Sequence, residues 1–202
     1  IKYNDNSTTI YRPTGATLNA AGQQNLTNDL IQSITYNENN DPIKITGEKG
    51  DVYFTYGLTN MRQAVGYGGK LDWIDEGHYT KYYNEDSSYE VVIDNTTGKE
   101  KHVMYIGGTP YEANIVYLKN YTESSGSYKF LHKDYLGSIL AITDEDGNIK
   151  EQRHFDAWGN LTHYKVNGVT KNVNEFNNLS LIDRGYISHE HFTEVGIIHM
   201  NG

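Results

Sequence analysis

The chain has 202 residues, an apolar fraction of only 37%, and 18 tyrosines against 5 phenylalanines and 2 tryptophans. Its formal net charge of −9 argues against a general nucleic-acid binder, which needs a basic face. The absence of cysteine excludes disulfides and thiolate metal sites, and the longest apolar runs are too short to span a membrane.

The first half of the chain predicts short strands separated by turns. Residues 17–34 are the exception, because their composition allows one short helix. Residues 32–46 predict strand, turn and strand, with the turn at 39–42, and Asp51–Tyr56 predicts a compact aromatic strand. Tyrosine favours strands, and its apolar ring with a polar hydroxyl suits a surface that is buried on one side and exposed to solvent at its edge.

The pattern continues through the second half. Residues 89–108 predict two strands around a turn at 95–98, and residues 144–147 predict the turn of a later hairpin. A recurrence of about 8 to 12 residues is typical of a meandering antiparallel sheet. The last stretch, 172–202, is less regular, and we expect a helical turn over 189–195 with Ser188 as its N-cap.

A soft internal repeat runs through these elements. It consists of an aromatic residue, a polar turn, a Gly or Asn, and then an apolar/polar alternation. Residues 36–45 and 155–162 are its clearest copies, and 53–57 and 82–87 are looser ones. Such a unit is a hairpin whose Asp or Asn ties the turn to its own backbone and whose Gly takes a positive φ. Successive units would add strands to one spiralling sheet.

Two stretches in the last third of the chain, residues 132–164 and 183–202, carry a distinctive set of motif residues. These are Tyr135, Leu136, Gly137, Ser138, Asp156, Gly159, Arg184, Gly185, Tyr186, His189, Glu190, His191, Met200, Asn201 and Gly202. With these residues, the last third of the chain resembles the Rhs repeat-associated core of bacterial Rhs proteins. Residues 1–131 resemble, less specifically, the degenerate YD repeats that precede this core.

The resemblance implies a mainly β fold of spiralling antiparallel hairpin repeats, followed by a short helical or irregular plug segment. Members of this family build a hollow shell that encloses a variable C-terminal toxin, and their relatives include toxin-complex shells and teneurins. The implied domains are YD-type repeats at 1–131 and a truncated core at 132–202. The implied setting is an exported protein, secreted or at the bacterial surface and used in bacterial competition.

The resemblance also implies partners. These are the toxin domain of the same polypeptide and the remaining shell repeats, with a secretion-system component or an immunity protein as further partners. It implies no cofactor and no nucleic-acid binding by this segment.

The sequence departs from the family pattern at two places. Ala157 stands where the family often has proline. Several members cut their toxin free as aspartyl autoproteases, but the resemblance places those aspartates beyond Gly202. Because the first residue is Ile1, we expect an excised or processed piece. Because the resemblance places the catalytic aspartates beyond Gly202, we expect that this chain alone is not an enzyme.

Some residues admit a second interpretation. His189, Glu190 and His191, with His199 nearby, are metal-ligand types, but their spacing does not suit a zinc helix and favours structural roles. Asp156 could pair with Asp183 or Asp134 for proteolysis, although a turn cap is favoured. We expect Arg184 to be an interior partner of a carboxylate. We expect turns, and no catalytic or phosphate loop, at Ser138 and at residues 66–69.

A carbohydrate- or surface-binding module is the alternative function. Its sugar platform would be formed by the aromatic faces of Tyr53, Tyr56, Tyr67, Tyr79, Tyr82, Tyr83 and Tyr89. That function predicts a closed barrel or sandwich with an aromatic cleft, whereas a shell segment predicts an open sheet with two edges.

Overall fold

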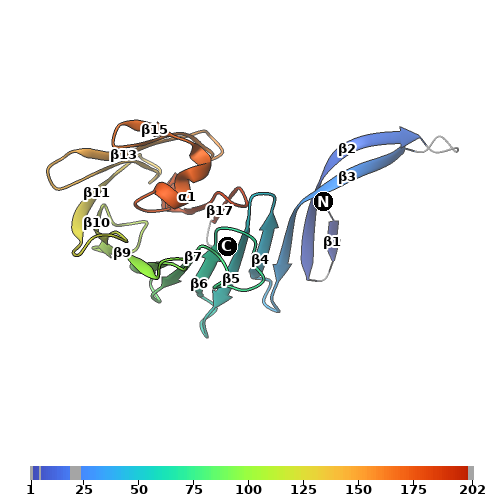
Figure 1. Cartoon of the computed structure of the whole chain (residues 1–202), viewed down its shortest axis with the longest axis horizontal. Helices are drawn as coiled ribbons and strands as arrows, with labels where there is room; N and C mark the ends of the chain where they lie inside the picture. The colour runs from blue at the N-terminus through green and yellow to red at the C-terminus, as the bar shows by residue number, and fades with distance from the viewer. Residues whose placement is uncertain (1, 5, 19–23, 200–202) are drawn as a thin grey trace.

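One antiparallel sheet forms most of the molecule in the computed structural model, which describes residues 2–4, 6–18 and 24–199. Its fifteen strands follow one another in sequence order, and the sheet curls around the C-terminal segment, residues 172–199 (Figure 1). The strands are β1 (Lys2–Asn4), β2 (Ser7–Leu18), β3 (Gln24–Tyr36), β4 (Pro42–Gly47), β5 (Asp51–Tyr56), β6 (Arg62–Tyr67), β7 (Tyr79–Tyr83), β8 (Tyr89–Asp94), β9 (Lys99–Ile106), β10 (Ile115–Lys119), β11 (Ser127–Lys133), β12 (Ile139–Thr143), β13 (Ile149–Phe155), β14 (Leu161–Val166) and β15 (Val169–Lys171).

The linear strand order confirms the predicted meander. Each strand pairs with its neighbours in sequence, so within the described residues the sheet has two edges, β1 and β15, and does not close into a barrel. Strands β2 and β3 form a long hairpin that extends away from the rest of the sheet (Figure 1). The predicted domain boundary at 131/132 falls inside β11, in the middle of this continuous sheet, and stays a prediction about motifs.

A five-residue turn recurs along the sheet. In each copy the first N–H donates to the fifth carbonyl, the fourth N–H donates to the first carbonyl, and the fourth residue has a positive φ. The copies are residues 37–41, 57–61, 134–138, 144–148 and 156–160. Asn40, Asn60, Gly137, Gly147 and Gly159 occupy the fourth position, where glycine and asparagine are the residues that accept left-handed backbone most readily.

An Asp or Asn side chain closes four of these turns. The Oδ1 atom of Asn37, Asp134, Asp144 or Asp156 accepts hydrogen bonds from the backbone N–H groups of the third and fifth residues. The pKa of Asp156 is lowered chiefly by a hydrogen bond from the Asn160 side chain to its second carboxylate oxygen, and further by the backbone N–H groups of the turn. The repeat seen in the sequence is therefore a hairpin unit with a self-capped turn.

The C-terminal segment folds back into the concave side of the sheet. It contains η1 (Val173–Glu175), α1 (Phe176–Leu179), η2 (Tyr186–Ser188) and a two-stranded hairpin of β16 (Glu190–Phe192) and β17 (Ile197–His199). Phe192 and Val195 join the apolar cluster of β4 to β8, whereas Ile182 joins a second cluster built on β9 to β12. The segment therefore completes both apolar clusters.

Three local predictions were wrong. Residues 24–34 lie in β3 and not in a helix, because pairing with β2 and β4 outweighs a weak local preference for helix. The rest of that prediction includes residues 19–23, which lie outside the described residues. Residues 190–192 form β16 and not a helical turn, because they pair with β17. Gly66 and Tyr67 end β6, so only Gly68 and Gly69 lie in a turn.

We predict that Gly159→Ala destabilises the protein more than Gly147→Ala. Both positions have positive φ, which costs about 1–2 kcal/mol with a side chain. At Gly147 an added Cβ meets nothing within 4 Å, but at Gly159 it lies 2.7 Å from Tyr186 and Ile198 of the C-terminal segment. Overpacking adds about 1–3 kcal/mol at Gly159. Urea unfolding of both variants measures the difference, and equal losses would contradict the packing described.

Candidate functional site

Charged side chains occupy core positions on the concave face of the sheet. In β7, Lys81 lies on the same face of the strand as Tyr79 and Tyr83. In β8, Glu90 lies on the same face as Val92. Side chains two residues apart share a face of a strand, so both charges point into the interior. Both side chains are almost completely buried. Buried charges require partners, and the C-terminal segment supplies them.

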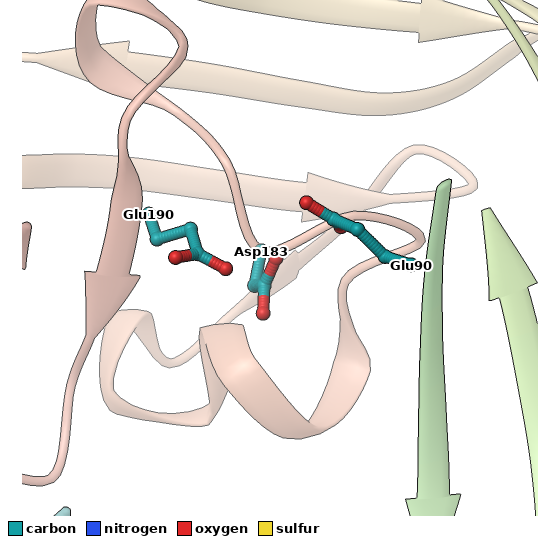
Figure 2. Close-up of side chains that lie close together, drawn as sticks. All are labelled: Glu90, Asp183 and Glu190. Carbon is teal, nitrogen blue, oxygen red and sulfur yellow. The ribbon is translucent and has the colours of Figure 1, made fainter. Parts of the chain in front are cut away.

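The Lys81 ammonium is surrounded by three carboxylates. Its Nζ lies 2.5 Å from Glu190 Oε1, 2.8 Å from Asp183 Oδ1 and 2.9 Å from Glu90 Oε2. Figure 2 shows these carboxylates gathered from two parts of the chain, with Glu90 on the sheet and the other two on the C-terminal segment. Their oxygens lie within 4.8 Å of one another, a spacing that would suit a metal ion, but Lys81 contacts all three. The protein therefore carries its own cation at this point.

Two arginines complete the network. Arg184 donates from Nη2 and Nε to Glu90 Oε1, at 2.6 and 2.9 Å. Arg62 of β6 donates to the second oxygen of Glu190. Three cations, Arg62, Lys81 and Arg184, thus face three anions, Glu90, Asp183 and Glu190. We call these six residues the ion network.

The network holds Lys81 and Glu190 in their charged forms. Burial by itself lowers the pKa of Lys81, but the carboxylates of Asp183, Glu190 and Glu90 outweigh it and hold the pKa well above its ordinary value. Burial by itself raises the pKa of Glu190, but Arg62, Lys81 and Arg184 hold it well below its ordinary value. Tyr83 and Tyr105 add hydroxyl hydrogen bonds to Glu190 and Glu90.

A second group of buried charges binds the backbone of the C-terminal segment. Arg153 of β13 pairs with Glu151 and donates to the carbonyl oxygens of Ile182 and Arg184. Glu151 accepts from the Leu181 N–H, and Lys101 of β9 donates to the Ser180 carbonyl at 3.2 Å. Side chains from β9 and β13 therefore satisfy polar backbone groups of residues 180–184 that have no sheet partner.

The motif residues near Gly185 form a tight junction. Ser188 Oγ donates to the Gly137 carbonyl at 2.9 Å, and Ser138 Oγ accepts from the Ile187 N–H at 3.2 Å. A Cβ on Gly185 would lie 2.7 Å from both His191 and Phe155.

His191 is held as a neutral ring. Its Nε2 accepts from the Tyr186 N–H at 3.0 Å, so this nitrogen carries no proton. The junction thus joins the turn at 134–138 to the segment 185–191.

The structure separates the residues of the sequence-based metal hypothesis. Glu190 belongs to the ion network, His191 packs on Phe155 and Phe176, and His189 packs on Tyr111. The oxygen cluster found among the described residues includes neither histidine. Burial lowers the pKa of His191 to about 4, which keeps the ring neutral.

The residues of the proteolytic hypothesis have separate partners. Asp156 and Asp134 cap turns, whereas Asp183 faces Lys81. Tyr135 and Leu136 are exposed at the tip of their turn. Met200, Asn201 and Gly202 lie outside the described residues.

The tyrosines do not form one platform. Tyr67 and Tyr83 are buried in the core, Tyr53 packs on Trp73, and Tyr89 stacks on His102. Tyr82 is exposed, whereas Tyr56 and Tyr79 pack against the apolar cluster of β4 to β8. The aromatic cleft expected of a sugar-binding module is therefore not built from these residues.

Comparisons with known proteins agree with the architecture. No family model matches the chain. Crystal structures of TcdB2-TccC3 and TcdB2-TccC3-TEV superpose on 81% of the chain with a TM-score of 0.59, at 13% and 14% identity. The tRNA3(Ser)-specific nuclease WapA of Bacillus spizizenii is 26% identical over 104 residues, or 52% of the chain. The chain has the fold of a Rhs/YD-repeat shell.

The shell fold confirms the fold class and the resemblance drawn from the motifs. The chain spans 8% of the length of the TcdB2-TccC3 chains and 4% of the length of WapA. No helix among the described residues is long and apolar enough to cross a membrane.

We predict that Lys81→Met lowers the free energy of unfolding by about 3–5 kcal/mol, because it removes the cation that contacts buried Asp183 and leaves the network with one excess negative charge. Lys44→Met is the matched control. Lys44 pairs at 3.2 Å with an exposed Asp72, and such surface pairs contribute about 0–1 kcal/mol. Chemical denaturation measures both variants. If both variants lose the same free energy of unfolding, the ion network does not contribute more to stability than a surface ion pair does.

We predict that the protein loses stability between pH 7 and pH 5 partly through His191. Its pKa is 6.5 in the unfolded chain and about 4 when folded, so the unfolded state binds the proton first. Stability is therefore complete above pH 6.5 and falls as pH drops toward 4, by about 2 kcal/mol at pH 5. His191→Gln should reduce this slope. If the dependence of stability on pH is unchanged in the His191 variant, His191 does not cause the loss.

Proposed function

We propose that this chain is a wall segment of a toxin-associated β-shell, and that its C-terminal segment is an internal clasp that holds the wall in a curve. The observation that carries the proposal is the ion network. It joins strands β6, β7 and β8 to residues 183–190 through charges that are stable only when both parts are in place.

The sheet itself supports an enclosing role. Strands β1 and β15 each have a single strand partner among the described residues, so both edges can add further strands. We infer that additional repeats continue the strip and that the resulting shell encloses a toxin domain of the same polypeptide. We further infer that the protein acts outside the cell that makes it, where a secretion-system component and an immunity protein would be its other partners.

A structural role fits the chemistry of the network better than a catalytic one. Each carboxylate contacts at least one cation at 2.9 Å or less, and three positive groups face three negative groups, which is an arrangement of ion pairs. An aspartyl pair needs two carboxyl groups that share one proton.

Protease protection tests the proposal. In the polypeptide that carries this chain, a domain that follows it should resist proteinase K while the shell is intact. Lys81→Met should expose that domain, whereas Lys44→Met should leave it protected. If the domain is digested in the unaltered protein as fast as it is in isolation, the chain does not enclose it.

A further inference from the structure

Two histidines face each other on the surface of the sheet that is opposite the ion network. His154 of β13 and His163 of β14 are direct cross-strand partners, and both are exposed. Their ring centres are 5.9 Å apart, with an interplanar angle of 80°. Gln152 and Lys165, the next cross-strand pair on this face, complete the lining of a hollow of about 270 Å³. No role for this pair follows from the fold or from the ion network.

A hydrogen-bonded chain through Thr162 fixes the protonation of one ring. The Thr162 hydroxyl donates to the His154 carbonyl at 3.1 Å. Because that hydroxyl has one hydrogen, its contact of 3.3 Å with His163 Nδ1 requires the ring to donate. A neutral His163 therefore carries its proton on Nδ1 and presents a free lone pair on Nε2. This is the arrangement in which protein histidines ligate metals, with the second nitrogen hydrogen-bonded to an orienting group.

A β-bulge creates this arrangement. His154 pairs with His163 and Phe155 pairs with Leu161, so Thr162 is the extra residue on β14. Bulges redirect side chains, and this one lets Thr162 bond to both strands at once. The His154 side chain is exposed and its ring contacts that of His163, so its nitrogens are accessible to a ligand.

We propose that His154 and His163 form a binding site for a transition-metal dication of the Zn²⁺, Ni²⁺ and Cu²⁺ class. These ions prefer imidazole ligands. A metal about 2.0–2.1 Å from one nitrogen of each ring needs ring centres roughly 5–6 Å apart, which is the separation found here. The Gln152 side-chain oxygen and water would complete the coordination. The bound ion would join β13 to β14 across the surface of the sheet.

Lys165 makes the proposal testable in both directions. Its ammonium lines the same hollow and opposes a bound cation, so removing its charge should strengthen metal binding. If the hollow instead serves an anion, the same change should weaken binding, because Lys165 and the protonated histidines would be its ligands.

The experiment is a titration of the metal-stripped chain with Zn²⁺ in phosphate-free buffer, observed through the ¹⁵N signals of the histidine rings. The signals of His154 and His163 should shift together, with Nε2 of His163 as the coordinating atom. His154→Gln and His163→Gln should each weaken Zn²⁺ binding at least about tenfold, and Thr162→Val should weaken it by about 10- to 100-fold. Lys165→Gln should strengthen it, and His132→Gln on the same face is the control.

Three results would overturn the proposal. The first is coordination by other histidines, with the His154 and His163 rings unchanged at stoichiometric Zn²⁺. The second is a Thr162→Val variant with unaltered Zn²⁺ affinity. The third is a response of both rings to inorganic phosphate and none to Zn²⁺. Because the substituted side chains are exposed, circular dichroism of each variant should match that of the unaltered chain and exclude unfolding as the cause.

Discussion

The contact between the Lys81 ammonium and three carboxylates constrains the rest of the structure. Lys81 and Glu90 belong to the sheet, whereas Asp183 and Glu190 belong to residues about a hundred positions later in the chain. Neither set can be buried alone, since a buried charge without a partner costs several kcal/mol. The sheet must therefore curve around the C-terminal segment before its concave face can lose water. Buried ion pairs contribute less to net stability than to specificity. Here they specify one register, because a shift of one residue would bury an unpaired charge.

The sheet that curves around the ion network is built from interactions between residues that are close in sequence. Self-capped turns reverse the chain at short intervals, and each needs only one Asp or Asn and one residue with positive φ. Contacts are then mainly between neighbouring strands, so the strip has no intrinsic limit on its length. The C-terminal segment departs from this pattern. It crosses many strands, contributes Phe192 and Ile182 to separate apolar clusters, and gives a repeating sheet a defined curve.

The difference between local and distant interactions explains what the sequence predicted. The hairpin around residues 144–147 and the strand Asp51–Tyr56 were predicted correctly, because their signals lie within a few residues. A short helix was allowed within residues 17–34, which include most of β3, because the pairing partner of β3, the strand β2, is not visible in the composition of that stretch. Arg184 was expected to have a carboxylate partner, but sequence reasoning could not name Glu90, which is 94 positions away.

Lys81, Arg62, Glu151 and Arg153 were missed as members of the interior. One signal could have found Lys81, Glu151 and Arg153, because each charge lies on the same face of its strand as apolar or aromatic residues, which are Tyr79 and Tyr83 in β7 and Ile149 and Phe155 in β13. Charged residues in a core phase predict a covering element with opposite charges, but they do not tell where in the chain that element lies. The three-dimensional fold is needed to place residues 183–190 on them.

Amide hydrogen exchange tests the central claim most directly, namely that the curved sheet and the C-terminal segment form one cooperative unit. The N–H of His191, which donates to the Asp183 carbonyl at 3.0 Å, should exchange only through the opening that also exposes β7 and β8. The free energies of opening for these amides should then agree. If the amides of residues 183–192 open at much lower free energy while β7 and β8 stay protected, the segment is a loosely attached cover and the account is wrong.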